Sequence, residues 1–342
     1  MTGPASLPAD GPREEENFLV FSAMKDEGAF LLEWVAWYRM LGFEVMVGVN
    51  DCTDHSPELL DVLQDAGWLT WFEHRPGPKL PPKSSAHAAM RDRPETAAAD
   101  WLMICDVDEF LVLHRGDGTI QSFLDDTGRD FLGMIFHWRC FGTSGWQRYR
   151  DGIVHRQFKR CGAAGHNVNA TFKMLFRDPL RFRHYSDHSP FNFDGDWAAP
   201  ENRVVDCEGR TVERFLTHPH PIRFTSKEEI THATAQMNHY VIRSDESFDL
   251  KRGKPSASAF KDRYTDTFYK ARNRNGHRDL SAQSYAPVFD AVHAEICKVP
   301  GAMRLHHLCC ADYVARLCAN RGAAAEEDAR WRMHIEEAAR LA

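Results

Sequence analysis

The hydrophobic and polar positions in the first third of the chain alternate between the patterns of strands and of helices. Residues 27–41 and 56–66 carry apolar side chains at helical spacing, and a glycine follows each segment. A proline-rich loop is expected at 75–83 and a further helix at 86–99. Short apolar runs of strand length occur at residues 18–23, 43–49, 68–72 and 101–105. Strands separated by helices of this length predict βαβ units and a largely parallel sheet.

The pattern changes after residue 106. Strand-like runs are expected at 131–138, 153–158, 171–176 and 230–236, and an irregular segment rich in His, Asp and Pro covers 179–221. Helices are expected at 286–296, at 303–317 and from Ala323 onward. We therefore predict a disordered leader at 1–16, one α/β domain at 17–255 and a helical C-terminal extension at 256–342.

The segment Asp106-Val107-Asp108-Glu109-Phe110 directly follows the strand expected at 101–105. Two carboxylates on alternate residues at the end of a buried strand repel each other and lose hydration unless a cation offsets them. A hard divalent ion held by one or two carboxylates and by substrate phosphates is the usual arrangement. Open α/β sheets also bind their ligands at this edge. The pair Asp106 and Asp108 therefore predicts a metal site, with a solvated acidic turn as the alternative.

Polar groups also follow the first two expected strands. Asn50, Asp51 and Asp54 could hydrogen-bond a base and a ribose, although Asx residues also form capped turns readily. Lys25 could reach a phosphate as a point charge. Glu27 opens the next helix, where an acidic group can simply complement the helix dipole.

Two later segments are further candidates. Trp138, Phe141 and Gly142 combine aromatic faces, which suit the apolar face of a sugar, with a glycine that allows close backbone approach. A plain loop between strands explains them as well. His239 could be a metal ligand or a hydrogen-bonded core residue. The pair His306-His307 is interpreted as structural, because no acidic partner stands at metal-ligand spacing.

Composition excludes several classes of protein. The net charge of −7, from 42 basic and 49 acidic residues, gives no global basic field for nucleic acid. No apolar run reaches the length of about eighteen residues that a membrane span requires. Residues 1–16 lack the apolar stretch of a signal peptide, and nine cysteines without a CxxC pair favour reduced thiols. A cytoplasmic location is expected, with peripheral attachment to the inner face of the membrane left open.

Five segments form an ordered series over about residues 17–255, which is far more specific than any one of them. They are Phe21–Gly28 with Leu32–Val35 and Tyr38, Asn50–Asp54, Trp101–Phe110, Trp138–Gly145, and Asn238–Tyr240 with Arg243-Ser244 and Lys251–Gly253. The series resembles the bacterial family 2-like glycosyltransferases, which are related to the family 92 galactosyltransferase-type enzymes. The resemblance implies a GT-A fold, a Rossmann-like, mostly parallel sheet flanked by helices that binds a nucleotide-diphospho-sugar with Mn²⁺ or Mg²⁺.

Site residues carry over by position. The resemblance implies that Asp106 and Asp108 are the metal-binding pair, the DxD motif of the family, with His239 as a third ligand. It also places Asn50, Asp51 and Asp54 at the base and ribose of the donor. Lys25, Glu27, Arg243 and Lys251 complete the expected donor site. Two departures are Asp26 in place of the usual Asn and Arg243 in place of the usual Lys, which changes a point contact with phosphate to a fork.

The activity implied is an inverting hexosyl transfer from a nucleotide-sugar, with a UDP-sugar expected, to a glycan or glycoconjugate acceptor in polysaccharide biosynthesis. Such a displacement needs a carboxylate to deprotonate the acceptor hydroxyl. Asp187 is the first candidate for this base, followed by Asp194, Asp196 and Glu109. A haloacid-dehalogenase-like phosphatase, which also has an Asp-x-Asp after a buried strand, and a non-catalytic sugar-nucleotide or glycan-binding module remain as alternatives.

Overall fold

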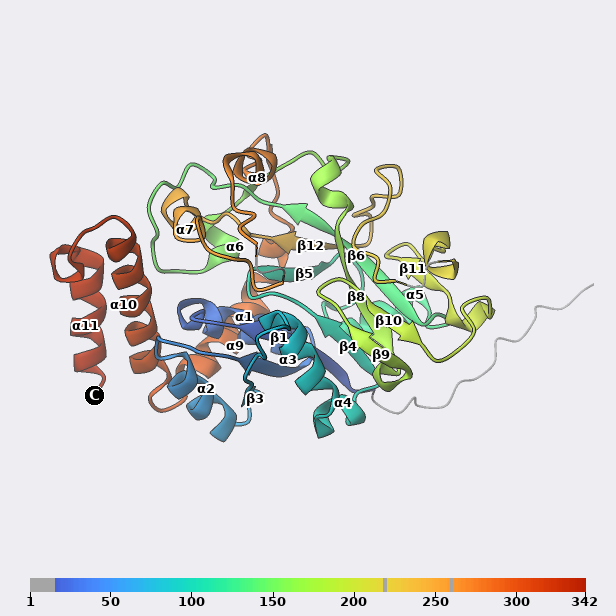
Figure 1. Ribbon diagram of the computed structural model, residues 1–342, viewed down its shortest axis with the longest axis horizontal. Coiled ribbons are helices and arrows are strands. Elements are labelled where there is room, and N and C mark those ends of the chain that lie inside the picture. Colours follow the sequence, from blue (N-terminus) through green and yellow to red (C-terminus); the bar gives the residue numbers. More distant parts are fainter. Residues whose placement is uncertain (1–15, 218–219, 259–260) are drawn as a thin grey trace, which may run out of the picture.

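A mixed sheet with helices on both of its faces forms the centre of the molecule (Figure 1). The computed structural model describes residues 16–217, 220–258 and 261–342, so the expected leader lies outside the described residues except for Glu16. The strands are β1 (Phe18–Met24), β2 (Glu44–Val49), β3 (Thr70–Glu73), β4 (Trp101–Ile104), β5 (Glu109–Leu113), β6 (Gly133–Cys140), β7 (Arg160–Cys161), β8 (Phe172–Arg177), β9 (Phe182–Tyr185), β10 (Pro190–Phe193), β11 (Val204–Asp206), β12 (Ala235–His239) and β13 (His277–Arg278). The helices are α1 (Gly28–Met40), α2 (Ser56–Asp65), α3 (Pro82–Arg91), α4 (Pro94–Ala98), α5 (Ile120–Thr127), α6 (Val154–Gln157), α7 (Asp245–Asp249), α8 (Asp266–Arg272), α9 (Ala286–Cys297), α10 (Ala302–Asn320) and α11 (Ala329–Arg340).

The strand directions bring distant segments to one edge of the main sheet. Its order is β3-β2-β1-β4-β8-β6-β12-β5, with β11 beside β6. Strands β1 to β4 are parallel, and β8 is antiparallel to both β4 and β6. Because β12 is parallel to β6, the strands β1, β2, β4, β6 and β12 all end at the same edge. The predicted α/β architecture, with a mostly parallel sheet and C-terminal helices, is confirmed.

The sheet separates two hydrophobic cores, which explains the continuous apolar runs in its strands. Phe18 and Val20 of β1 belong to the core that contains α1, α9 and α10. Their neighbours Leu19 and Phe21 belong to the core that contains α3 and β9. A parallel strand buried on both faces shows no alternation of polar and apolar residues.

Proline accounts for two differences from the expected helices. The helix expected at 86–99 is interrupted, and α4 starts at Pro94, which has no N–H to continue the hydrogen-bond ladder of α3. Helix α3 begins at Pro82, inside the loop expected at 75–83, because a proline is well tolerated in the first helical turn. Strand β5 and helix α5 were not predicted at all.

The strand predicted at 153–158 is wrong, because this segment forms the short helix α6. The buried carboxylate of Glu33 on α1 accepts hydrogen bonds from the backbone N–H groups of Val154 (2.6 Å) and His155 (3.2 Å). It also contacts His155 Nδ1 at 2.8 Å. A distant side chain thus satisfies the first N–H groups of the helix, which local sequence cannot reveal.

Replacing Glu33 by alanine is expected to lower the free energy of unfolding by about 3 kcal/mol, because it leaves buried donors without an acceptor. Chemical denaturation measures this change. The control is Glu44→Ala, which removes an exposed carboxylate paired with Arg39 and should cost less than about 1 kcal/mol. Equal effects of the two substitutions would show that Glu33 does not hold α6 in place.

The C-terminal helices pack directly on the α/β body. Helix α9 packs on α1, and α10 packs on α1, α2 and α11. Arg330 of α11 forms ion pairs with Glu246 (2.7 Å) and Asp328 (2.7 Å). Helices α9 and α10 share a hydrophobic core with α1. The domain boundary expected near residue 255 stays a prediction. Among the described residues, no helix combines the length and apolar character needed to cross a membrane.

Candidate functional site

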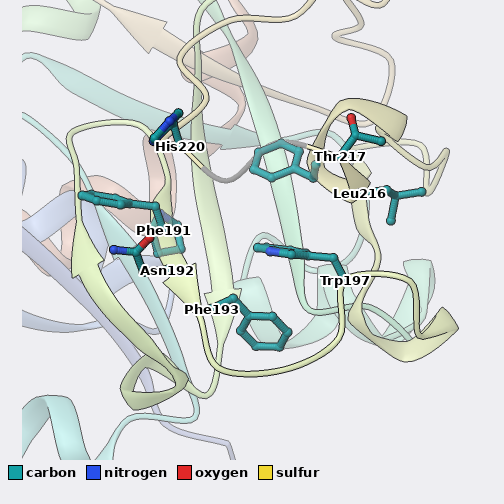
Figure 2. Close-up of a pocket in the computed structure, with 9 residues that line it drawn as sticks. Phe191, Asn192, Phe193, Trp197, Leu216, Thr217 and His220 are labelled. Carbon is teal, nitrogen blue, oxygen red and sulfur yellow. The ribbon is translucent and has the colours of Figure 1, made fainter.

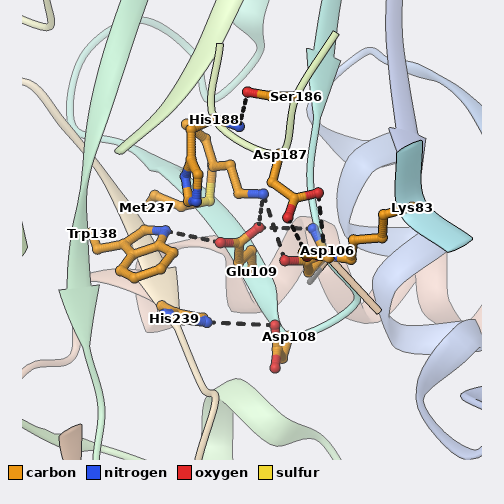
Figure 3. A network of polar contacts seen from close by, with 12 residues as sticks. Lys83, Asp106, Asp108, Glu109, Trp138, Ser186, Asp187, His188, Met237 and His239 are labelled. Atoms are coloured by element: carbon orange, nitrogen blue, oxygen red, sulfur yellow. Dashed lines mark hydrogen bonds and ion pairs between the residues drawn. The ribbon is translucent and has the colours of Figure 1, made fainter. Parts of the chain in front are cut away.

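Asp106 and Asp108 lie in the short turn between β4 and β5, at the edge where the parallel strands end (Figure 3). The ammonium of Lys83 is paired with Asp106 Oδ1, and that of Lys173 lies 3.6 Å from Asp106 Oδ2. Asp108 Oδ2 lies 3.4 Å from Lys251 Nζ. Burial raises the pKa of Asp108, but Lys251 and other nearby cations outweigh burial and bring it to about 2. Lys173 and Lys83 likewise outweigh burial and lower the pKa of Asp106, so both carboxylates are ionised and lie in a strongly cationic environment.

Glu109 and Lys173 form a buried pair behind the two aspartates. Glu109 accepts hydrogen bonds from Trp138 Nε1 (2.8 Å) and from the backbone N–H of Asp106 (2.7 Å). Its Oε2 also lies 2.8 Å from Lys173 Nζ. Burial raises the pKa of Glu109, and Lys173 opposes that rise. Both oxygens of Glu109 are engaged and neither reaches solvent.

Lys173 is a functional candidate that the sequence analysis missed. It is fully buried on β8, with its ammonium between the carboxylates of Asp106 and Glu109. Burial opposes its charge, but the two carboxylates more than compensate and raise its pKa. The one signal in the sequence is a lysine in the otherwise apolar run Phe172–Phe176. A cation in such a run requires a buried acidic partner.

His239 ends β12 and faces Asp108 across the site (Figure 3). Its Nε2 lies 3.6 Å from Asp108 Oδ1, and no described residue hydrogen-bonds its buried Nδ1. Burial lowers its pKa to about 3, so the imidazole is neutral, as a metal ligand must be.

The distance between the side chains of Asp108 and His239 fits two ligands of one metal ion. Ligand atoms about 2.1 Å from one ion lie about 3 Å apart at right angles and about 4 Å apart when opposite. The 3.6 Å between Asp108 Oδ1 and His239 Nε2 falls within this range. Asp106 is less suited to bind the ion, because the ammonium groups of Lys83 and Lys173 already neutralise the charge of its carboxylate. Asp108 and His239 are thus the residues best placed to hold a divalent ion.

The polar groups after β2 divide into exposed and internally bonded ones. Asp54 is buried and accepts hydrogen bonds from the N–H groups of Ser56 (3.1 Å) and Gly28 (3.4 Å), so it caps a turn. Asn50 donates a hydrogen bond to Asp51 at 3.0 Å. Asp51 is exposed and has a φ of 46°, a left-handed conformation that Asp tolerates. Of these residues, Asp51 is the one most accessible to a ligand.

Glu27 and Arg243 lie near Asp108, whereas Lys25 is exposed on the turn after β1. Arg243 Nη1 lies 3.4 Å from Glu27 Oε2. The guanidinium also covers the ring of Phe30, 3.4 Å from its centroid. Burial raises the pKa of Glu27, while Arg243 and Lys251 oppose that shift. Arg243 is therefore held in a fixed orientation close to the acidic pair.

Asp187 lies in a cleft of about 620 Å³ that adjoins the acidic pair. Lys83 joins the two, with its Nζ 3.5 Å from Asp187 Oδ1 and paired with Asp106. Ser258 donates a hydrogen bond of 2.6 Å to Asp187 Oδ2. The cleft, which we call the Asp187 cleft, is also lined by the cationic side chains of Arg223, Lys261 and Arg263. It is therefore suited to an anionic or strongly polar ligand.

The other candidate bases lie elsewhere. Asp194 is half exposed and pairs with Arg181 at 3.4 Å. Asp196 accepts a hydrogen bond from the N–H of Ala198 and so forms a turn. Neither residue lines the Asp187 cleft.

The residues expected to bind the acceptor make other contacts in this structure. Phe141 is 1% exposed and packs on Tyr240. A Cβ on Gly142 would lie 2.6 Å from Asn273 Oδ1, so the glycine is needed for chain packing. Trp138 is 8% exposed, and its indole N–H is used by Glu109. An acceptor role for these three residues stays a prediction.

A second hollow offers aromatic surface instead (Figure 2). It has a volume of about 470 Å³, and Phe191, Phe193, Trp197 and Phe215 line it. Phe191 lines the Asp187 cleft as well, so the two hollows are neighbours. We call this hollow the aromatic groove. Its sequence signal is three aromatic residues within seven positions of the segment that was expected to be irregular.

No protein-family model and no curated protein matches the chain. Among solved structures it is similar to TarS of S. aureus, with 12% identity over 95% of this chain and 91% of that one, at a TM-score of 0.34. TarS in complex with UDP-GlcNAc gives a TM-score of 0.31. The mannosyltransferase Ktr4p of S. cerevisiae matches 38% of this chain and 41% of its own at 7% identity and a TM-score of 0.24. At these values the matches establish no correspondence between individual residues.

Proposed function

We propose that this protein is a metal-dependent, inverting glycosyltransferase of the GT-A type that uses a nucleotide-sugar donor. The observation that carries the proposal is the pairing of Asp108 with His239 at the edge where five parallel strands end. This is where open α/β sheets bind nucleotides, and the donor set suits a divalent ion. A bound ion would act as a Lewis acid toward the leaving diphosphate.

The cations around the acidic pair are suited to a diphosphate. Lys251 lies beside Asp108, and Arg243 lies beside Glu27 with its orientation fixed by Phe30. Arg243 offers a planar fork of donors that matches phosphate oxygens, whereas Lys251 acts as a point charge. A UDP-sugar is the donor we propose to test first. Asn50 and Asp51 would contact its base and ribose.

Asp187 is better placed than Glu109 to be the base. Its carboxylate lines the cleft next to the acidic pair, whereas Glu109 is sealed in the interior and holds Trp138 and the backbone of Asp106. Burial raises the pKa of Asp187, but Lys83 and other nearby cations outweigh burial and lower it. A bound diphosphate would compete for Lys83, and loss of this ion pair would make Asp187 a stronger base.

The aromatic groove supplies a surface for the acceptor. Sugars stack their apolar faces on aromatic rings, and Phe191 lines both the groove and the cleft that contains Asp187. A glycan lying along Phe191 and Trp197 would direct one hydroxyl toward the base. We therefore propose a glycan or glycoconjugate acceptor.

Calorimetric titration of UDP into the protein with and without Mn²⁺ tests the donor site. Binding that needs the metal is the expected result. If the affinity for UDP were the same with and without Mn²⁺, the proposal that donor binding depends on the metal would be contradicted. Release of phosphate from simple phosphomonoesters would instead favour a phosphatase. UDP binding without turnover on any acceptor would favour a binding module.

Replacing His239 by glutamine is expected to weaken Mn²⁺ binding by about tenfold or more and to reduce transfer equally, because a direct ligand is lost. Glutamine keeps most of the buried volume, so the melting temperature should change little. The control is His232→Gln, which removes a partly buried imidazole that contacts the carbonyl of Trp138 at 2.8 Å and should keep the affinity for Mn²⁺. A lower melting temperature with unchanged Mn²⁺ affinity for His239→Gln would show that His239 is a packing residue.

A further inference from the structure

A second cluster of metal-ligating side chains lies away from the proposed active site. It joins Asp151, in the loop between β6 and α6, to His306 and Cys310 on α10. His306 and Cys310 are four residues apart and thus on one face of the helix. One possible ligand atom of each of the three residues lies within 4.8 Å of the others. All nine cysteines fall in the described part of the chain and are free, so the thiol of Cys310 is available.

The separations match those of a tetrahedral ion. His306 Nε2 lies 3.5 Å from Asp151 Oδ1 and 3.5 Å from Cys310 Sγ. In a tetrahedral zinc site with ordinary bond lengths, a nitrogen and an oxygen ligand are about 3.4 Å apart, and a nitrogen and a sulfur ligand about 3.6 Å apart. The observed distances differ from these by about 0.1 Å.

Hydrogen bonding explains the arrangement less well. Both neighbours approach the same nitrogen, Nε2, which can carry one proton and donate it in one direction. A distance of 3.5 Å is also long for a hydrogen bond from nitrogen to a carboxylate oxygen. A Cys-His-Asp catalytic triad would use both ring nitrogens, and Cys310 is fully buried, out of reach of a substrate.

The ligand types in the cluster indicate which class of cation it would bind. The combination of thiolate, imidazole and carboxylate ligands suits zinc better than the harder Mg²⁺ or Ca²⁺.

We propose that Asp151, His306 and Cys310 form a binding site for a zinc-class transition-metal ion, with water at the fourth position. The ion would connect α10 to the loop that carries Asp151. Tyr149 in the same loop contacts Cys310 Sγ through its hydroxyl at 3.6 Å and packs edge-on against Phe30. Phe30 in turn supports Arg243, so the ion would stabilise the wall behind the proposed donor site.

Cobalt substitution of the full-length protein tests this site, because a thiolate bound to Co²⁺ gives a charge-transfer band in the near ultraviolet. We expect the wild-type protein to show this band at one Co²⁺ per chain, and Zn²⁺ to displace the Co²⁺. The variant Cys310→Ala should lose the band and bind one zinc ion fewer per chain. The matched control is Cys309→Ala, which removes the neighbouring buried thiol and should keep the band.

A second variant separates this proposal from the proposed function. Asp108→Ala should keep the thiolate band, since Asp108 belongs to the other site. If Cys310→Ala does not fold, His306→Gln should lose the band with Cys310 still present. Absence of the band in the folded wild-type protein, or a band that persists in Cys310→Ala, would overturn the proposal.

Discussion

Asp108→Ala is expected to abolish metal-dependent UDP binding and to lower kcat/KM for transfer by about 1,000-fold or more, equivalent to about 4 kcal/mol of transition-state stabilisation. The substitution removes the carboxylate that lies 3.6 Å from His239 and leaves Lys251 without its acidic partner. The fold should persist, because Lys251 still donates a hydrogen bond to the carbonyl of Val241 at 2.9 Å. Calorimetry with UDP and Mn²⁺, together with steady-state kinetics, measures both effects.

An exposed aspartate provides the control for this substitution. Asp65 lies near the end of α2, and Asp65→Ala should leave UDP binding, transfer and melting temperature unchanged. If Asp108→Ala bound UDP and Mn²⁺ as the wild type does, the ion could not be held by Asp108. Unfolding of Asp108→Ala would show instead that the acidic pair is structural.

Asp187→Asn is expected to reduce kcat by about 100- to 10,000-fold, the range of general base catalysis, while leaving the dissociation constant for UDP within about twofold of the wild type. Asparagine can still accept a hydrogen bond from Ser258 but cannot take a proton from the acceptor hydroxyl. Comparing kcat with the calorimetric affinity for UDP separates catalysis from donor binding.

Asp194→Asn is the matched control for the base, because Asp194 is a carboxylate close in sequence that lies outside the Asp187 cleft. It should keep wild-type kcat. The assignment fails if Asp194→Asn loses activity and Asp187→Asn keeps it. A loss of UDP affinity in Asp187→Asn equal to the loss in kcat would make Asp187 a donor-binding residue.

The sequence predicted the local elements of the α/β half well, because each strand there is a short apolar run between helical patterns. It did not predict the order of the strands. The antiparallel strand β8 between β4 and β6 brings Lys173 beside Asp106, although 67 positions separate the two residues. The helix at 154–157 was missed for a similar reason, since its N-terminus is satisfied by Glu33 from α1.

The candidate site was predictable where its residues follow strands that end at one edge. Asp106, Asp108 and His239 meet there because β4 and β12 run in the same direction. The aromatic groove was not predicted, because its residues come from two separate stretches, 190–197 and 215–217 together with His220, whose contact depends on the folded chain. The expected acceptor residues illustrate the same limit: Phe141 has the right chemistry but packs in the core.

The most direct test of the proposed activity is the release of nucleoside diphosphate from a panel of UDP-, GDP- and dTDP-sugars, with and without Mn²⁺. UDP-GlcNAc belongs in the panel. We predict that sugars of one nucleotide class, with UDP expected, release the diphosphate in the presence of Mn²⁺ and that chelation of the metal stops the release. If no nucleotide-sugar in the panel bound or released its nucleotide with Mn²⁺ present, the protein would not be a glycosyltransferase of this kind.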